Sequence, residues 1–135
     1  MTSLAGSCGC GAVRLAAEAD ARRIVNCHCM MCRRMNGSAF SSYVVIPWKT
    51  LSVLGDEHLA TYEAAPGARK HYCRKCGTPL FNLSDRYPGA CMLYLGAIEP
   101  QLVGVPSLNL YCENMLNWVE RIGSIEKVQA GADGK

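Results

Sequence analysis

Three cysteines lie within one six-residue segment, Cys27-His28-Cys29-Met30-Met31-Cys32. Alternate side chains of an extended chain share a face, so Cys27 and Cys29 can reach one metal ion together while His28 points away. A turn over the next two residues can return Cys32 as a third ligand. The segment therefore predicts a zinc site with three thiolate ligands.

The fourth position of such a tetrahedral site decides its class. An open position is typical of catalytic or substrate-binding zinc, whereas a fourth protein ligand would make the site structural. The candidates for a fourth ligand are His28, Cys91 and Cys112. Spacing alone leaves both forms possible. Cys91 and Cys112 have no close cysteine neighbours, and by default we expect each to be a buried apolar thiol.

A second group of thiols predicts a closed structural zinc site. It combines a C-x-C pair with a C-x-x-C pair: Cys8, Cys10, Cys73 and Cys76. Gly77 follows the second pair, where a tight turn needs positive φ or a close approach of N–H to sulfur. A redox C-x-x-C is the alternative, but Pro79 blocks the helix that such a motif requires.

Composition favours a globular zinc protein. The chain has 135 residues, 50% of them hydrophobic and 19% charged, which suits one domain. We expect a single zinc-binding domain over residues 1–135, with a core of about 5–128 and a flexible tail over 129–135. Nine cysteines indicate either disulfides or metal.

The expected compartment decides between disulfides and metal. Residues 1–19 show no apolar segment after a basic start, and no run is long enough to cross a membrane. We therefore expect a cytoplasmic protein with no membrane partner, in which reduced thiols bind zinc.

The net charge of +3 is mildly basic. Positive residues gather near the cysteines in sequence: Arg33, Arg34, Arg69, Lys70, Arg74 and Lys75. A small anionic ligand fits this pattern as well as nucleic acid does. Only Tyr72 is an aromatic neighbour of these residues, which makes nucleic acid an unlikely partner.

Short strands and one short helix must position the thiols. Residues 30–36 predict a helix that ends at Gly37 in a left-handed cap. β-Branched, aromatic and alternating patterns predict strands over residues 12–17, 24–29, 38–46, 51–54, 58–62, 81–84, 91–95 and 108–111. His58 and His71 are expected to be surface or packing residues. Trp118 and Val119 are expected to close the core.

The ordered motifs resemble the glutathione-dependent formaldehyde-activating enzyme family, which also includes centromere protein V. The resemblance covers roughly residues 5–120. It rests on Gly6-Ser7-Cys8-Gly9-Cys10-Gly11, Cys27-His28-Cys29-Met30-Met31-Cys32-Arg33, Gly37-Ser38-Ala39-Phe40, Tyr72-Cys73-Arg74-Lys75-Cys76-Gly77 with Leu80-Phe81, Leu95-Gly96 and Trp118.

The resemblance implies a mainly β, tent-like fold of short antiparallel strands with two zinc ions per chain. Cys8, Cys10, Cys73 and Cys76 would hold the structural zinc. Cys27, Cys29 and Cys32 would hold the catalytic zinc with an open position, beside Arg33 as a candidate catalytic residue. The implied reaction adds glutathione to formaldehyde, as an S-(hydroxymethyl)glutathione synthase does, and is carbon–sulfur lyase chemistry in reverse.

One departure concerns the substrate. The family often carries a histidine nine residues before the tryptophan, where this chain has Asn109. We therefore predict a zinc-dependent carbon–sulfur lyase acting on adducts of glutathione or another thiol with formaldehyde or a related small aldehyde. The alternatives are a non-catalytic zinc-stapled module that binds protein or nucleic acid, and a thiol redox or metal-handling protein. A homodimer is one possible assembly.

Overall fold

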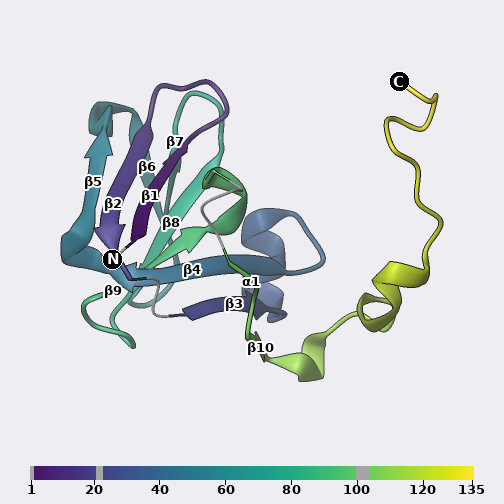
Figure 1. Ribbon diagram of the computed structural model, residues 1–135. Coiled ribbons are helices and arrows are strands. Elements are labelled where there is room, and N and C mark those ends of the chain that lie inside the picture. Colours follow the sequence, from purple (N-terminus) through teal and green to yellow (C-terminus); the bar gives the residue numbers. More distant parts are fainter. Residues whose placement is uncertain (1, 21–22, 100–103) are drawn as a thin grey trace.

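Two β-sheets form the body of the molecule in a computed structural model that describes residues 2–20, 23–99 and 104–135 (Figure 1). The smaller sheet has three antiparallel strands in the order β1-β2-β5. Their bounds are β1 (Thr2–Ser7), β2 (Arg14–Ala19) and β5 (Leu51–Leu54).

The larger sheet has seven strands in the order β10-β3-β4-β9-β8-β7-β6. Its strands are β3 (Arg23–Cys27), β4 (Ser41–Pro47), β6 (Leu59–Ala65), β7 (Ala68–Cys73), β8 (Pro79–Ser84), β9 (Ala90–Tyr94) and β10 (Leu108–Leu110). Every pairing is antiparallel except that of β10 with β3. The predicted mainly β class with short antiparallel strands is confirmed.

The predicted helix is present as α1 (Met30–Asn36). Cys29 caps its first turn, and Gly37 ends it with a left-handed φ of 61°. Short 3-10 helices lie between and after the strands: η1 (Trp48–Thr50), η2 (Asp56–His58), η3 (Leu95–Ala97), η5 (Cys112–Asn114) and η6 (Val119–Ser124). In the part of the chain that the structure describes, no helix has the length and apolar character to cross a membrane.

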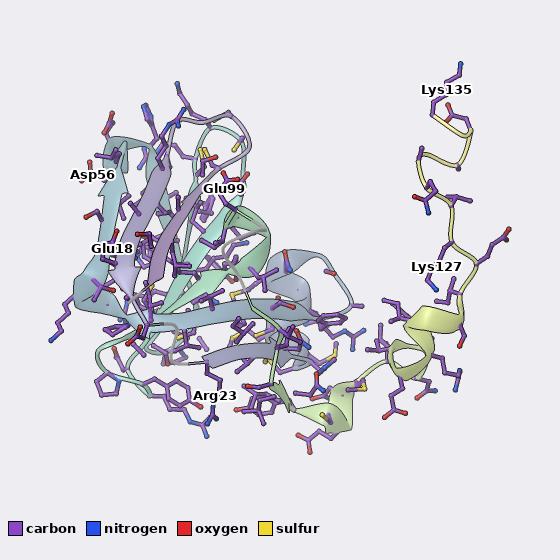
Figure 2. All side chains as sticks on the ribbon, viewed as in Figure 1. Glu18, Arg23, Asp56, Glu99, Lys127 and Lys135 are labelled. Carbon is purple, nitrogen blue, oxygen red and sulfur yellow. The ribbon has the colours of Figure 1, made fainter. Side chains whose placement is uncertain are left out.

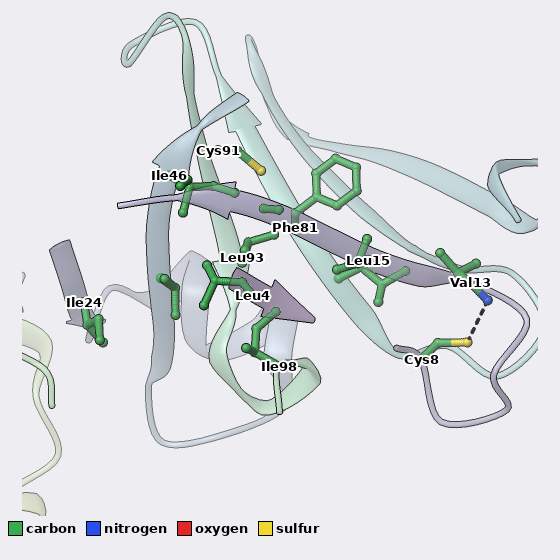
Figure 3. Close-up of a cluster of buried hydrophobic side chains, with 14 of the residues drawn as sticks. Leu4, Cys8, Val13, Leu15, Ile24, Ile46, Phe81, Cys91, Leu93 and Ile98 are labelled. Carbon is green, nitrogen blue, oxygen red and sulfur yellow. Dashed lines mark hydrogen bonds between the residues drawn. The ribbon is translucent and has the colours of Figure 1, made fainter. Parts of the chain in front are cut away.

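The main hydrophobic core fills the space between the sheets (Figure 3). Leu4 and Leu15 enter it from the smaller sheet, while Ile46, Phe81 and Leu93 enter from the larger sheet. All five side chains are buried. Burial of apolar side chains stabilises the fold by about 1.5–3 kcal/mol for each large residue.

A second buried cluster lies on the opposite face of the larger sheet. Side chains alternate between faces along a strand, so Val44 joins the main core while its neighbour Tyr43 joins this cluster. Tyr94 and two of the predicted metal ligands, Cys27 and Cys32, also belong to it. The sheet therefore separates the three-thiol segment from the main core.

After η5, the chain runs away from the body as an extended arm, which carries Lys127 and Lys135 (Figures 1 and 2). The expectation that Trp118 and Val119 close the core is wrong. Trp118 is 41% exposed, and Ile122 and Ile125 are more than half exposed. The reason is that the two sheets and α1 already cover the apolar interior before the arm begins.

Candidate metal centres

The structure brings the four cysteines of the predicted structural site together. Cys8 and Cys10 follow β1, Cys73 ends β7, and Cys76 lies in the turn before β8. The four sulfurs lie within 4.8 Å of one another. The Sγ atoms of Cys8 and Cys10 are 3.7 Å apart, and those of Cys10 and Cys73 are 3.9 Å apart. Tetrahedral zinc with bonds of about 2.3 Å places its sulfurs about 3.8 Å apart, so the cluster fits the ion.

Hydrogen bonds favour the thiolate form at two of these sulfurs, those of Cys8 and Cys76. The backbone N–H of Val13 donates to Cys8 Sγ over 3.3 Å (Figure 3). The Thr78 hydroxyl and backbone lower the pKa of Cys76 to about 5, since they stabilise the charged form. Gly77 has a φ of +79°, which supplies the tight turn predicted after the C-x-x-C pair. The chain then enters β8 at Pro79, so the strand-to-helix context of a redox motif is absent at this point.

The three cysteines of the second predicted site also converge. Cys27 ends β3, Cys29 caps α1, and Cys32 lies inside the helix. Their sulfurs lie within 4.8 Å of one another. Cys27 and Cys32 are buried, whereas Cys29 is partly exposed. A hydrogen bond with Cys32 lowers the pKa of Cys27 to about 6. A metal held here would face solvent on the Cys29 side.

No fourth Cys, His, Asp or Glu joins this group among the residues that the structure describes. His28 is 1% exposed, but its Nε2 lies 3.2 Å from Asn109 Oδ1. Cys91 is buried in the main core across the sheet, as its default interpretation predicted. Cys112 is exposed, so the expectation that it is a buried apolar thiol is wrong. The chain has already left the core there, because Tyr111 turns it with a φ of +55° into η5.

Two buried polar residues beside this group were not found from the sequence. The Tyr43 hydroxyl, from β4, donates to Cys32 Sγ over 3.2 Å. Asn82, from β8, donates in turn to the Tyr43 hydroxyl oxygen over 3.2 Å. No motif links these strands to the cysteine segment. Only the strand order of the sheet, in which β9 separates β4 from β8, reveals the contact.

A groove of about 490 Å³ runs beside α1. Its walls include Met30, Arg33, Arg34, Ser38, Leu116 and Trp118. Arg33 Nη1 donates to the carbonyl oxygen of Asn114 over 3.4 Å, which ties α1 to the start of the arm. The groove therefore combines two positive charges with an apolar wall, and its lining residue Met30 directly follows Cys29 in the chain.

The other predicted basic residues have separate partners. Arg69 pairs with Asp85 over 3.2 Å, and Arg74 donates to the carbonyl oxygen of Leu59. Lys70 donates to the carbonyl oxygen of Met35, at the last turn of α1. Lys75, like these three residues, does not line the groove. The anionic character predicted for a ligand therefore depends on the two arginines of α1.

The predicted packing role of the histidines fits their places in the fold. The His71 ring stacks on Phe81 with the ring centroids 4.4 Å apart. His58 is the last residue of η2, and its Nε2 lies 3.5 Å from Glu57 Oε1. Neither histidine belongs to a sulfur cluster.

Comparison with known proteins gives the relationship of this chain. The family model for "glutathione-dependent formaldehyde-activating enzyme" matches residues 3–114, a range that contains both sulfur clusters. The chain belongs to this family. The resemblance predicted from the motifs is thereby confirmed.

Two sequence relatives and one solved structure are similar to this chain. A protein of Halomonas elongata named "Putative glutathione-dependent formaldehyde-activating enzyme" is 33% identical over 126 residues, which is 87% of this chain and 80% of that protein. A Schizosaccharomyces pombe protein named as an uncharacterized lyase is 30% identical over 81 residues, 60% of this chain and 58% of that protein. A crystal structure of a Rhodobacter sphaeroides protein matches with a TM-score of 0.63 at 23% identity, over 77% of this chain and 98% of that one. That last likeness shows the fold alone.

For this member of the family, the structure shows what occupies the position of the common histidine. Asn109 lies in β10, whose parallel pairing places it opposite Asn26 of β3. Asn109 Oδ1 accepts from Asn26 Nδ2 over 3.1 Å and lies against His28. In this chain the position therefore fastens β10 to β3 beside the three-thiol group.

Proposed function

We propose that this protein is a zinc-dependent carbon–sulfur lyase. Its substrates would be adducts of glutathione, or another thiol, with formaldehyde or a related small aldehyde. The observation that carries the proposal is the three-sulfur group, which has no fourth ligand among the described residues. Helix α1, which holds one of these sulfurs, also lines the arginine groove. Family membership and the lyase name of a relative support the same class of reaction.

Zinc suits both sulfur groups because it prefers thiolate ligands and tetrahedral geometry. Cys8, Cys10, Cys73 and Cys76 would hold a structural ion that ties the β1–β2 turn to the β7–β8 turn. Cys27, Cys29 and Cys32 would hold the second ion. When bound there, zinc would supply a positive charge that keeps a substrate thiol deprotonated near neutral pH. A reducing compartment such as the cytoplasm would keep the nine free thiols available.

The groove would bind the rest of the thiol. Glutathione carries carboxylates, and the guanidinium group of Arg34 can bind a carboxylate through paired hydrogen bonds. Leu116 and Trp118 would cover the apolar parts of the ligand from the other side. Arg33 lies one helical turn after Cys29, whose carbonyl oxygen accepts its backbone N–H, so its positive charge would lie on the same side of the helix as that ligand.

The reaction balances without any further reagent. In the synthetic direction, the thiolate sulfur forms a bond to the aldehyde carbon, and the carbonyl electron pair moves to oxygen, which takes up a proton. In the lyase direction, the adduct hydroxyl loses that proton, the carbonyl forms again, and the carbon–sulfur bond breaks. Arg33 would stabilise the oxygen anion by charge and hydrogen bonding.

The experiment is to measure the conversion of ¹³C-formaldehyde and glutathione into their adduct by exchange NMR. Wild-type protein should increase the exchange rate above the uncatalysed rate. Cys29→Ser should lose this increase. Cys112→Ser is the matched control, because Cys112 is exposed and lies outside both sulfur groups.

Esterified glutathione tests the role of the groove. It keeps the thiol but lacks the carboxylates, so it should react less efficiently than glutathione, and the difference should shrink in Arg34→Gln. The lyase proposal is wrong if the wild-type protein carries two zinc ions but does not accelerate adduct formation with any thiol tested. The non-catalytic zinc-stapled module would then be the better account.

A further inference from the structure

A buried chain of hydrogen bonds connects the larger sheet to one sulfur of the three-thiol group. Asn82 Nδ2 donates to the Tyr43 hydroxyl oxygen, and the Tyr43 hydroxyl donates to Cys32 Sγ, each over 3.2 Å. Asn82 is 8%, Tyr43 is 4% and Cys32 is 6% exposed. Water therefore has little access to these bonds, and each is stronger than it would be at the surface.

The donors and acceptors on Asn82, Tyr43 and Cys32 fix the direction of these two hydrogen bonds. A tyrosine hydroxyl has one proton to donate, and the amide of Asn82 already donates to its oxygen. That arrangement leaves the proton pointing at Cys32 Sγ. The Tyr94 ring packs edge-on against the Tyr43 ring, with centroids 5.0 Å apart, and restricts its movement.

The sulfur of Cys32 differs from that of Cys29 in the source of its hydrogen bond. Cys29 Sγ accepts a hydrogen bond from the backbone N–H of Cys32, within the helix. Cys32 Sγ instead accepts from a side chain of the sheet beneath the helix. The contact fixes the sulfur relative to the sheet, and it draws electron density away from the sulfur.

We infer that Tyr43, oriented by Asn82, is a positioning residue that holds Cys32 Sγ and weakens its electron donation to a bound metal. The inference rests on the metal centre of the proposed function and deepens it. Three thiolates give a divalent ion a net negative site, which opposes binding of a fourth thiolate. Hydrogen bonds to metal-bound sulfur offset part of that charge, as outer partners of metal ligands commonly do.

Cadmium-113 NMR of the fully loaded protein tests this inference without measuring activity. Cadmium binds thiolates as zinc does, and four-sulfur and three-sulfur sites give separate resonances. In Tyr43→Phe, the three-sulfur resonance should shift while the four-sulfur resonance stays in place. The four-sulfur resonance thus reports whether the variant has kept its fold.

Two further variants separate the hydrogen bond from simple packing. Asn82→Leu removes the donor that orients the hydroxyl, and should shift the three-sulfur resonance in the same direction by less. Tyr94→Phe is the matched control, because it keeps the ring that packs against Tyr43 and removes a buried hydroxyl that has no hydrogen bond with Cys32.

The outcome is decided by comparison with this control. A larger shift in Tyr43→Phe than in Tyr94→Phe, with Asn82→Leu between them, supports the inference. Equal shifts in Tyr43→Phe and Tyr94→Phe would overturn the inference. Equal shifts are also expected if the Tyr43 hydroxyl donates to Asn82 rather than to Cys32 Sγ. A wild-type protein with only one cadmium resonance would overturn the metal centre itself. Two resonances without acceleration of adduct formation would reject the lyase function alone.

Discussion

The two sulfur groups should respond very differently when one cysteine is replaced by serine. Cys29 is the N-cap of α1, and its Sγ accepts the backbone N–H of Cys32 over 3.3 Å. Serine is among the best N-cap residues, so Cys29→Ser keeps the cap. We expect its free energy of unfolding, measured without metal, to fall by less than about 1 kcal/mol. As isolated, this variant should lose one of two bound metal ions.

Cys73→Ser removes a ligand that is also part of the main core. The Cys73 side chain is fully buried. Burying a serine hydroxyl there in place of the less polar thiol costs about 1–3 kcal/mol where its hydrogen bonds stay incomplete. Loss of the structural ion adds to this, because metal binding at such a site contributes directly to the folding free energy. The total loss should therefore be about 3 kcal/mol or more in the metal-loaded protein.

The assay is urea unfolding followed by circular dichroism, with metal content measured by elemental analysis on the same preparations. Cys112→Ser should match the wild type in both measurements, since Cys112 is exposed and outside both groups. The reasoning would be refuted if metal-loaded Cys73→Ser lost less than about 1 kcal/mol relative to the metal-loaded wild type, or if Cys29→Ser kept both metal ions.

Three further outcomes test the fold and the order of metal binding. Phe81→Ala should destabilise the protein by about 3–5 kcal/mol in urea unfolding, because Phe81 is 1% exposed; a loss under about 1 kcal/mol would contradict its core position. Gly37→Ala should lower the free energy of unfolding by about 1 kcal/mol through its left-handed φ alone, since an added Cβ meets no described atom within 4 Å. Gly37→Asn should lower it by less, and equal losses in the two variants would argue against this cap. A chromophoric chelator should remove one metal ion before the other, because one group has three ligands and the other has four; simultaneous release would contradict that difference.

Features that depend on nearby residues could be predicted from the sequence. The helix bounds Met30–Asn36 match the prediction, because Gly37 marks the C-terminal end with a left-handed cap. The strand Leu51–Leu54 also matches its predicted bounds. The grouping of seven cysteines into two clusters followed from ligand spacing and agrees with where their sulfurs lie.

Features that depend on neighbouring strands could not be predicted in this way. β1 is rich in small and polar residues, and β7 carries Arg69 and Lys70, so neither has an alternating apolar pattern. Each is a strand because an adjacent strand supplies its hydrogen-bond partners. The contacts of Tyr43 with Asn82 likewise arise from the order of strands in the sheet, which local spacing does not encode.

The most direct test of the proposed open metal centre is metal content together with glutathione binding. Elemental analysis and titration calorimetry should be done on the same preparations of wild-type protein and Cys29→Ser. The proposal predicts two zinc ions and glutathione binding in the wild type, with one zinc ion and no glutathione binding in Cys29→Ser. Two zinc ions with no thiol binding in the wild type, or unchanged binding in Cys29→Ser, would contradict it.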